Sequence, residues 1–491
     1  MKTSSAISTT ALLAWMLFGL SSRAQEPVAP AASSSDDATT TSSEPSVPVS
    51  ANSKVRIVRL SEVKGEVQLD RKTGKGFEGA MANLPVTEGS RLKTGNGVAE
   101  VEFEDNSTIR VAPNSLVEFP RLELLPSGAK ASGINVLQGM VYVSLVNTKG
   151  NEFSVKFGQQ TVNLPPDSHV RVQLTPTEGN LAVLHGDVQV EEPSGSTTVG
   201  KNKTATFNLA TPSEPVIAKS VVDQPTDSWD KDAVQYHKSY ANASSFGNSP
   251  YAYGINDMNY YGSFVNGCGG SMWRPYFTSA SWDPFGSGAW AYYPSAGYSW
   301  VSPYPWGWTP YHYGSWGFCQ GLGWGWQPGG AWMGLANNSF VSPTNSLGSS
   351  GTLRPHPPIH APTAAESSFV PVNLKTIPAS SLGAHDTFVF RSDSAGLGVP
   401  RGTLGKLNSF SNQTAQHGTA SANVYYGGER GESEARTANS GQFSSAESRS
   451  SSSSMHSAAG SGSHVSAGSG MGSGAGSNAG SGGGAGGGAR R

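Results

Sequence analysis

Aromatic side chains are the residues of this 491-residue chain best suited to binding a ligand, and they are concentrated in one stretch. Ten of its 12 tryptophans lie between Trp273 and Trp332. Flat apolar rings with polar N–H and O–H edges suit stacking on sugars, and exposed rings also serve protein partners. If some rings are exposed, the expected face for a glycan or a protein partner comprises Trp306, Trp308, Trp316, Trp324 and Trp326. The alternative is that the rings pack on one another as the core of a domain with few aliphatic residues.

The two cysteines, Cys268 and Cys319, bracket much of this stretch. In an oxidising compartment they would be able to form a disulfide. The bond would close a loop of about 50 residues, which the chain-entropy description values at about 4 kcal/mol of stability. The alternative is a pair of buried free thiols, and the sequence leaves both open.

Residue patterns for catalysis, metal binding and cofactor binding are missing. The chain contains no G-x-S-x-G, H-E-x-x-H or C-x-x-C motif and no G-x-x-x-x-G-K-[ST] motif. His312 has no acidic residue or second histidine beside it, so we expect a packed or hydrogen-bonded imidazole. His356 and His360 are four residues apart, but prolines between them prevent the helix that would aim both at one metal ion. We therefore predict no enzyme activity, no metal and no cofactor.

The elements that must position the aromatic rings are expected to be short. Residues 251–335 contain only three charged side chains but many glycines and prolines, so packed rings must supply the core of this segment. Trp290 and Trp300 are ten residues apart, and the same spacing recurs twice after Trp306. This spacing predicts antiparallel strands or loops in a meander, with aromatic side chains meeting in one layer. The prolines in the stretch are expected to exclude a helix.

Residues 54–210 have a different pattern, in which apolar and polar residues alternate in short runs. This period of two indicates half-buried strands, and turn residues recur about every ten positions. The clearest runs are 98–103, 107–111, 139–145, 152–157, 169–174 and 187–190. We predict no helix here, and we expect the 17 basic and 17 acidic residues to lie on solvated faces. The expected fold class is mainly β: an antiparallel sandwich or short solenoid, then a small aromatic β/loop module, with disordered terminal segments.

The start of the chain predicts export. Ten apolar residues (11–20) follow Lys2 and precede a small-residue pattern at 22–24, as in a signal peptide cleaved before Gln25. The apolar run spans only about half of the hydrocarbon core, which argues against an uncleaved anchor. The mature chain is therefore expected in the periplasm or outside the cell, without a membrane-spanning segment. Its net charge of −2 gives no electrostatic reason to bind nucleic acid.

The rest of the chain is expected to be mostly linker. Residues 230–240 are a short predicted helix, and Trp229 before it is expected to dock onto a neighbouring element. Residues 369–374 and 387–391 are strand-like runs in an otherwise irregular stretch. The predicted segments are a signal peptide (1–24), a disordered Ser/Thr/Pro linker (25–53), the β domain (54–210), a linker (211–250), the aromatic domain (251–335), a Pro/Ser-rich, mostly irregular segment (336–430) and a disordered Gly/Ser tail (431–491).

Three runs in the β domain resemble the FecR domain. Residues 91–119 (RLKTGNGVAEVEFEDNSTIRVAPNSLVEF) contain a Thr-Gly turn, a strand, an acidic tight turn and a second strand. Residues 137–141 are similar to its L-x-G-x-V step and residues 185–190 to its closing G-x-V-x-V strand. The chain departs from the family at 164–169, where the family often has an Arg-Gly-Thr step. The resemblance implies a β fold over about 150 residues, and the family's name suggests control of a sigma factor. We expect neither a cytoplasmic N-terminal domain nor a spanning helix in this chain, so the resemblance implies a fold more than a pathway.

The aromatic stretch resembles a tryptophan-rich domain of unknown function that follows FecR domains in secreted bacterial proteins. The matching runs are 272–275 (MWRP), 297–301 (GYSWV), 305–316 (PWGWTPYHYGSW) and 323–329 (GWGWQPG). The family brings no established activity.

These observations together predict a non-enzymatic secreted envelope protein that acts as a binding or structural scaffold. Its expected partner is peptidoglycan, another envelope polysaccharide or an envelope protein. The alternative is a FecR-like extracytoplasmic sensor or regulator that signals through a membrane partner. A second alternative is an unrecognised polysaccharide hydrolase.

Overall fold

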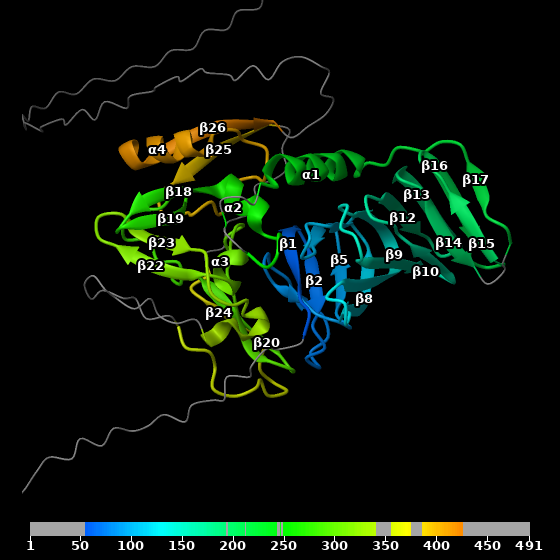
Figure 1. The fold of residues 1–491 in the computed structure, drawn as a ribbon, viewed down its shortest axis with the longest axis horizontal. Coiled ribbons are helices and arrows are strands. Elements are labelled where there is room, and N and C mark those ends of the chain that lie inside the picture. The colour runs from blue at the N-terminus through cyan, green and yellow to red at the C-terminus, as the bar shows by residue number, and fades with distance from the viewer. Residues whose placement is uncertain are drawn as a thin grey trace, which may run out of the picture. The chain divides into compact units, whose positions relative to one another are not determined.

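The fold of residues 55–192, 195–211, 213–242, 246, 249–339, 355–374 and 385–425 is described by a computed structural model (Figure 1). As the sequence predicts, this part of the chain is mainly β. The strands from β1 (Val58–Lys64) to β17 (Val216–Ala218) form the strand domain, and the elements from α2 (Ile255–Tyr261) to β24 (Phe369–Val372) form the aromatic domain. The predicted signal peptide, the linker at 25–53 and the Gly/Ser tail lie outside the described residues.

One antiparallel sheet of the strand domain, sheet A, has the strand order β4-β1-β6-β7-β9-β12-β13-β16-β17. Its strands are β1 (Val58–Lys64), β4 (Pro85–Val86), β6 (Val98–Glu102), β7 (Thr108–Val111), β9 (Lys130–Ser144), β12 (His169–Leu174), β13 (Glu178–His185), β16 (Lys203–Asn208) and β17 (Val216–Ala218). Within the described residues, β4 and β17 each pair with one neighbour and form the two edges of this sheet.

A second sheet, sheet B, has the order β3-β2-β5-β8-β9-β10-β11-β14-β15. Its further strands are β2 (Val67–Asp70), β3 (Glu78–Gly79), β5 (Arg91–Thr94), β8 (Leu116–Leu124), β10 (Glu152–Phe157), β11 (Gln160–Asn163), β14 (Val188–Glu192) and β15 (Gly195–Val199). The β9–β10 pair is parallel, and the other pairs are antiparallel.

Strand β9 belongs to both sheets and passes from one to the other at Gly139. Residues 130–138 pair with β8 of sheet B, and residues 139–144 pair with β12 of sheet A. Gly139 has a φ of 83°, and a Cβ atom there would lie 2.2 Å from the hydroxyl oxygen of Ser115. Only glycine fits this corner, which explains the glycine in the L-x-G-x-V step.

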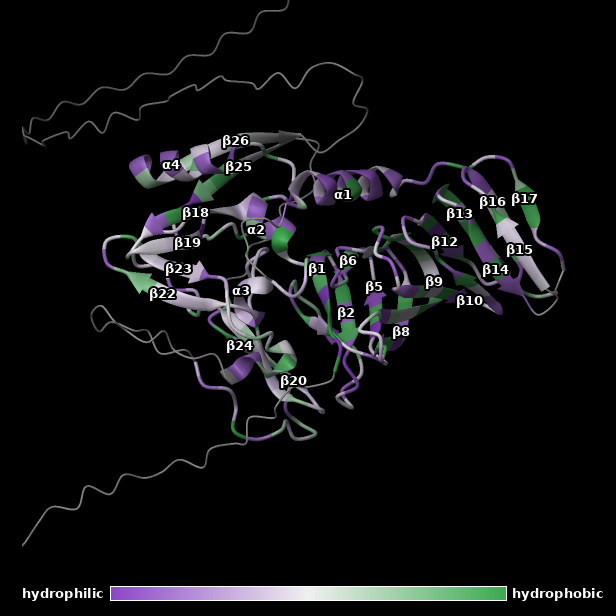
Figure 2. Ribbon diagram, viewed as in Figure 1, coloured by the Kyte–Doolittle hydropathy of each residue, from purple (hydrophilic) through white to green (hydrophobic). Residues whose placement is uncertain are grey.

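Alternation along the strands places apolar side chains between the two sheets. In β10, Phe153, Val155 and Phe157 are buried while the residues between them are more exposed. Phe153 packs edge-on against Phe103, and Phe157 against Phe207 of sheet A, with ring centroids 5.3 and 5.6 Å apart. Figure 2 shows hydrophobic and hydrophilic residues interleaved along these strands. The six predicted runs all fall on strands, and the described residues of 55–210 contain no helix, as predicted.

The aromatic domain contains two small sheets built from hairpins. One has the order β18-β19-β23-β22 and the other β21-β20-β24. Their strands are β18 (Gly262–Gly267), β19 (Gly270–Pro275), β20 (Gly288–Tyr293), β21 (Gly297–Val301), β22 (Ser315–Cys319), β23 (Gly323–Gln327) and β24 (Phe369–Val372). Trp290 lies directly opposite Trp300 in one hairpin, and Trp316 opposite Trp326 in another. Two of the three ten-residue spacings therefore mark antiparallel hairpins with facing tryptophans, as predicted, whereas Trp306 lies outside the strands and the sheet order β18-β19-β23-β22 is not a simple meander.

Helices in the aromatic domain are the part that the sequence analysis missed. They are α2 (Ile255–Tyr261), α3 (Thr309–His312) and the 3₁₀ helix η2 (Gly334–Ser339). The prediction that the prolines exclude a helix is wrong for α3, because Pro310 lies in its first turn. At that position the missing N–H group would have no partner within the helix anyway.

The segments on either side of the aromatic domain are more ordered than predicted. Helix α1 (Asp227–Tyr240) begins three residues earlier than expected, with two acidic residues in its first turn that suit the helix N-terminus. As predicted, Trp229 docks on a neighbour: its indole N–H donates to Glu62, 3.2 Å away. β24 and β25 (His385–Arg391) coincide with the two predicted strand-like runs. Helix α4 (Leu407–His417) and strand β26 (Thr419–Tyr425), which pairs with β25, were not predicted.

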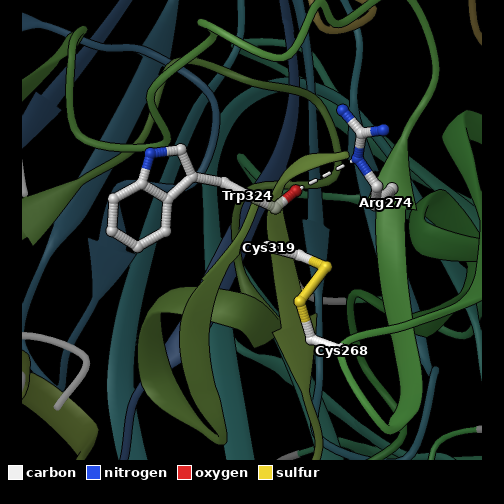
Figure 3. Close-up of a disulfide and its surroundings, with 4 residues drawn as sticks. All are labelled: Cys268, Arg274, Cys319 and Trp324. Carbon is white, nitrogen blue, oxygen red and sulfur yellow. Dashed lines mark hydrogen bonds between the residues drawn. A yellow bond between two sulfur atoms is a disulfide. The ribbon is translucent and has the colours of Figure 1, made fainter. Parts of the chain in front are cut away.

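A disulfide joins Cys268 and Cys319 (Figure 3), so of the two alternatives the structure has the bonded one. Cys268 lies in the turn between β18 and β19, and Cys319 is the last residue of β22. Beside it, the Nε atom of Arg274 on β19 donates to the carbonyl of Trp324 on β23, 3.1 Å away. The covalent bond therefore links the β18–β19 turn to outer strand β22 of the same sheet, which the Arg274 side chain also holds together.

Reduction of this disulfide is expected to lower the free energy of unfolding by about 2–4 kcal/mol, because a loop of 51 residues gains freedom in the unfolded chain. Urea denaturation of the oxidised protein and of the C268S/C319S variant measures the loss. A reducing agent should destabilise the wild type and leave the variant unchanged. Equal midpoints for the two proteins would contradict the prediction.

Candidate functional site at the domain junction

The five tryptophans predicted to form an exposed face are buried. The exposed fractions of Trp306, Trp308, Trp316, Trp324 and Trp326 are 0, 0, 1, 4 and 0%. The indole N–H groups of Trp306, Trp316 and Trp326 donate to the backbone carbonyls of Ala395, Pro310 and Tyr313. The expectation that these rings are exposed is wrong, and the structure has the alternative, a core of packed aromatic rings.

The composition of the domain explains this burial. With few aliphatic side chains available, leaving one ring exposed would forfeit about 1.5–3 kcal/mol of burial. Trp306 illustrates the packing, since it lies parallel to Tyr304 at 5.1 Å and edge-on to Trp273 at 5.0 Å between ring centroids. Such offset and edge-on pairs are the arrangements that aromatic rings prefer.

His312 is a packed and hydrogen-bonded imidazole, as predicted. It is buried, and its Nδ1 atom lies 2.8 Å from the carbonyl of Gly334, to which it donates. Its ring packs against Trp308 and Trp332, with centroids 4.2 and 5.3 Å away. Burial lowers the pKa of His312 from the ordinary 6.5 to about 4.

Stability is expected to fall as the pH is lowered from 6.5 to 4, because the unfolded chain protonates His312 in this range while the folded protein does not. The shift corresponds to about 3 kcal/mol. Urea denaturation across this pH range, on the wild type and on His312→Gln, isolates the contribution of the imidazole. The variant should show a shallower pH dependence, and parallel curves would contradict the assignment.

Buried charged residues gather where the strand domain meets the aromatic domain. Arg59 of β1 is fully buried and lies at their centre. Its Nη1 atom is 2.9 Å from Glu102 of β6 and 2.7 Å from Asp257 of α2. Its Nη2 atom donates to the carbonyl of Pro305 at 2.5 Å. One guanidinium group thus connects both domains, and we call the surrounding set of buried charges the junction network.

Strand register explains how the junction network forms. Arg59 on β1 lies opposite Glu102 on β6, and Glu100 on β6 lies opposite Arg110 on β7. Because Glu100 and Glu102 are two residues apart, they face the same side of the sheet. All four residues are fully buried, so the expectation that the charges of this domain lie on solvated faces is wrong here. In the sequence, the only sign of these buried ion pairs is that charged residues recur at every second position of adjacent strands. The strand pairing must be known before the partners can be recognised.

Glu100 is surrounded by donors from three different parts of the chain. Its Oε1 atom accepts from the hydroxyl of Ser61 at 2.7 Å and from Nη1 of Arg401 at 2.6 Å, and it lies 3.0 Å from Nε2 of His237. The amide nitrogen of Asn256 lies 2.6 Å from Nδ1 of His237, which leaves Nε2 as the protonated nitrogen that donates to Glu100. Burial opposes the charge of Glu100, but His237 and Arg401 outweigh burial and hold its pKa well below the ordinary value.

Two neighbouring carboxyl groups have opposite pKa shifts. Burial raises the pKa of Glu102, and the negative charge of Asp257 adds to the rise, although Arg59 opposes it. Burial also favours a higher pKa for Asp257, but the positive charges of Arg401 and Arg59 outweigh burial and lower the pKa of this carboxyl group. Of Glu100, Glu102 and Asp257, only Glu102 therefore has a raised pKa.

Two aspartates in the first turn of α1 attach that helix to sheet A. Asp230 accepts from Nε of Arg110 at 2.9 Å and lies 3.0 Å from Nε2 of His169. Asp227 accepts from Arg171 and from the hydroxyl of Tyr142, both at 2.7 Å. The segment predicted as a linker therefore packs on the strand domain through buried ion pairs.

Neutral groups complete the junction. The amide nitrogen of Asn83 donates to the carbonyls of Ser302 and Tyr304, at 2.9 and 2.6 Å. The hydroxyl of Tyr293 donates to the carbonyl of Pro85 on edge strand β4, at 2.6 Å. Together with the ion pairs, these contacts fix the aromatic domain against one end of sheet A.

Comparison with known families identifies both domains. Residues 90–189 match the model of the FecR protein family, and residues 255–348 match a family of unknown function, DUF6600. The chain carries a FecR domain followed by a DUF6600 domain. Glu100, Glu102 and Arg110 lie within the matched range of the FecR domain and Asp257 within that of the DUF6600 domain, whereas Arg401 lies outside both.

Two crystal structures of presumed anti-sigma factors from Parabacteroides distasonis ATCC 8503 are similar to the chain. The first has 14% identity and a TM-score of 0.24, and the match covers 28% of this chain and 63% of the other. The second has 12% identity and a TM-score of 0.25, and the match covers 37% of this chain and 96% of the other. No curated protein matches the chain. Within the part of the chain that the structure describes, every helix is too short or too polar to cross a membrane.

Proposed function

We propose that the chain is a FecR-type regulator of the cell envelope that acts by contact with a protein partner and catalyses no reaction. The match of residues 90–189 to the FecR family carries the proposal. The signal-peptide pattern at 1–24 supports export, which would place the FecR domain on the outer side of the cytoplasmic membrane. Its partner would then be a membrane or envelope protein.

The burial of the tryptophans favours a protein partner over a glycan. A scaffold that binds peptidoglycan or another polysaccharide through stacking needs aromatic faces in contact with solvent. The five rings proposed for that role are at most 4% exposed and lie within the core. The glycan-binding scaffold is therefore the weaker of the two candidate functions.

An open strand edge supplies a surface suited to a protein. Among the described residues, β17 pairs only with β16, so its other edge offers unpaired N–H and C=O groups. Val216 and Ile217 of β17 are 71 and 38% exposed, and nearby Val222 is 70% exposed. An extended segment of a partner would add a strand here and cover these side chains.

Deletion of the gene in the source organism, followed by complementation and transcript sequencing, tests the proposal. We expect deletion to change a defined set of transcripts and the wild-type chain to restore them. The V216K/I217K variant should fail to restore them at equal protein level, because two charges oppose strand addition. The matched control is S196K/T198K on β15, the polar edge strand of sheet B, which should restore them.

Two results would overturn the proposal. The first is an unchanged set of transcripts after deletion. The second is saturable binding of the wild-type chain to isolated peptidoglycan that persists in the V216K/I217K variant. This result would favour the scaffold.

A further inference from the structure

Arg401 enters the junction network from a segment outside both matched domains. It lies in the loop between β25 and α4, and it is 301 residues from Glu100 in the sequence. Nη1 donates to Glu100 at 2.6 Å, Nε donates to Oδ1 of Asp257 at 2.8 Å, and Nη2 to Oδ2 of Asp257 at 3.2 Å. The same guanidinium therefore makes a two-pronged contact with one carboxylate and a single contact with another.

The groups around Arg401 match the shape of a guanidinium as well as its charge. The ring of Tyr236 on α1 lies below it, with the guanidinium carbon 4.6 Å from the ring centroid. The hydroxyl of Tyr236 donates to Asp257 at 2.7 Å and thereby orients the carboxylate. An aromatic face, a paired carboxylate and a second carboxylate form the cage that suits a planar cation and serves an ammonium group poorly.

The acidic side of this cage depends on the arginine. The second oxygen of Glu100, Oε2, is buried without a hydrogen-bond partner and lies 3.5 Å from Nη1 of Arg110. Arg59 faces Asp257 from β1, and His237 faces Glu100 from α1. Burial opposes the charge of Arg401, but Asp257 and Glu100 raise its pKa well above the ordinary value. Removal of Arg401 would leave carboxylate charge that the remaining groups only partly balance.

We infer that Glu100, Asp257 and Tyr236 form a binding site selective for a guanidinium group, which Arg401 of the C-terminal segment occupies in this chain. The acceptor groups lie on the FecR domain, α1 and the DUF6600 domain, whereas the occupant comes from the C-terminal segment. The site itself does not depend on the proposed regulatory role, and its test needs no partner.

Chemical rescue of the full-length Arg401→Ala variant tests the site. Methylguanidinium should raise the thermal midpoint of this variant by about 2–4 °C at saturating millimolar concentration, because it refills the cage, and should leave the wild type unchanged. Titration calorimetry should show one site for N-acetyl-arginine amide, at least tenfold tighter than for N-acetyl-lysine amide. The matched control is Arg121→Ala, which removes an exposed arginine that also contacts two carboxylates and should show no rescue.

Each outcome decides the inference. Equal shifts in the wild type, Arg401→Ala and Arg121→Ala would show a general solvent effect and overturn it, as would absence of binding to the folded variant. If Arg401→Ala does not fold alone, refolding from urea is compared in methylguanidinium and in methylammonium. Recovery only in methylguanidinium supports the site, and equal recovery or none overturns it.

Discussion

Replacement of Arg59 by methionine is expected to lower the free energy of unfolding by about 3–5 kcal/mol. Arg59 is fully buried, and its guanidinium contacts both Glu102 and Asp257. Methionine fills part of the same volume but supplies no charge, so two carboxylates stay buried without this partner. Urea denaturation at neutral pH measures the loss.

Two further variants separate the charge effect from packing. Glu102→Gln, combined with Arg59→Met, removes one of the stranded charges and should recover part of the loss, since an uncompensated buried charge is the main cost. Arg121→Ala, which breaks exposed ion pairs, should cost no more than about 1 kcal/mol. If Arg59→Met costs as little as Arg121→Ala, the junction network does not hold the two domains together.

The strand domain was predictable because its signal is local. Each predicted run alternates over four to seven residues, and a strand buried on one face needs only that pattern. The corner at Gly139 could be recognised only as part of a family motif, because the reason for the glycine is the closeness of Ser115, which lies just before β8. Local patterning therefore gave the elements, and the contacts between them required the structure.

The spacing of the tryptophans predicted hairpins but not the direction of the rings. Trp290 and Trp300 had to meet across a hairpin once the turn was placed, and they do. Whether a ring faces solvent depends on what covers it, and Ala395 of the C-terminal segment covers Trp306 from 89 residues away. A stretch assigned as irregular thus completes the core of the aromatic domain.

The junction network was out of reach of the sequence for the same reason. Glu100 is held by groups that lie 39, 137 and 301 residues away. Nothing near Glu100 distinguishes it from a carboxylate on a solvated strand face. An i, i+2 pair of acidic residues in an otherwise apolar run, as in VAEVEF, becomes informative only when a basic residue is known to lie opposite.

Replacement of Trp306 by alanine is also expected to cost about 3–5 kcal/mol of unfolding free energy, the usual loss for a large buried aromatic side chain. Trp306 is fully buried and packs on Tyr304 and Trp273, and its N–H group donates to the carbonyl of Ala395 at 2.7 Å. The variant would leave a cavity and an unpaired carbonyl. Thermal and urea denaturation of the full-length protein measure the loss.

A matched control is Trp229→Ala, which removes a half-buried tryptophan on α1 that makes one hydrogen bond, to Glu62. It should cost less than half as much, because less of its ring is withdrawn from water. The loss of unfolding free energy in Trp306→Phe should lie between those of Trp306→Ala and Trp229→Ala, since phenylalanine keeps an aromatic ring but loses the N–H donor. If Trp306→Ala instead leaves stability unchanged and weakens binding of an envelope glycan, the ring belongs to a binding face, and its assignment to an aromatic core is contradicted. If the ring is part of the core, stability should increase from Trp306→Ala to Trp306→Phe to the wild type, and glycan binding should not change.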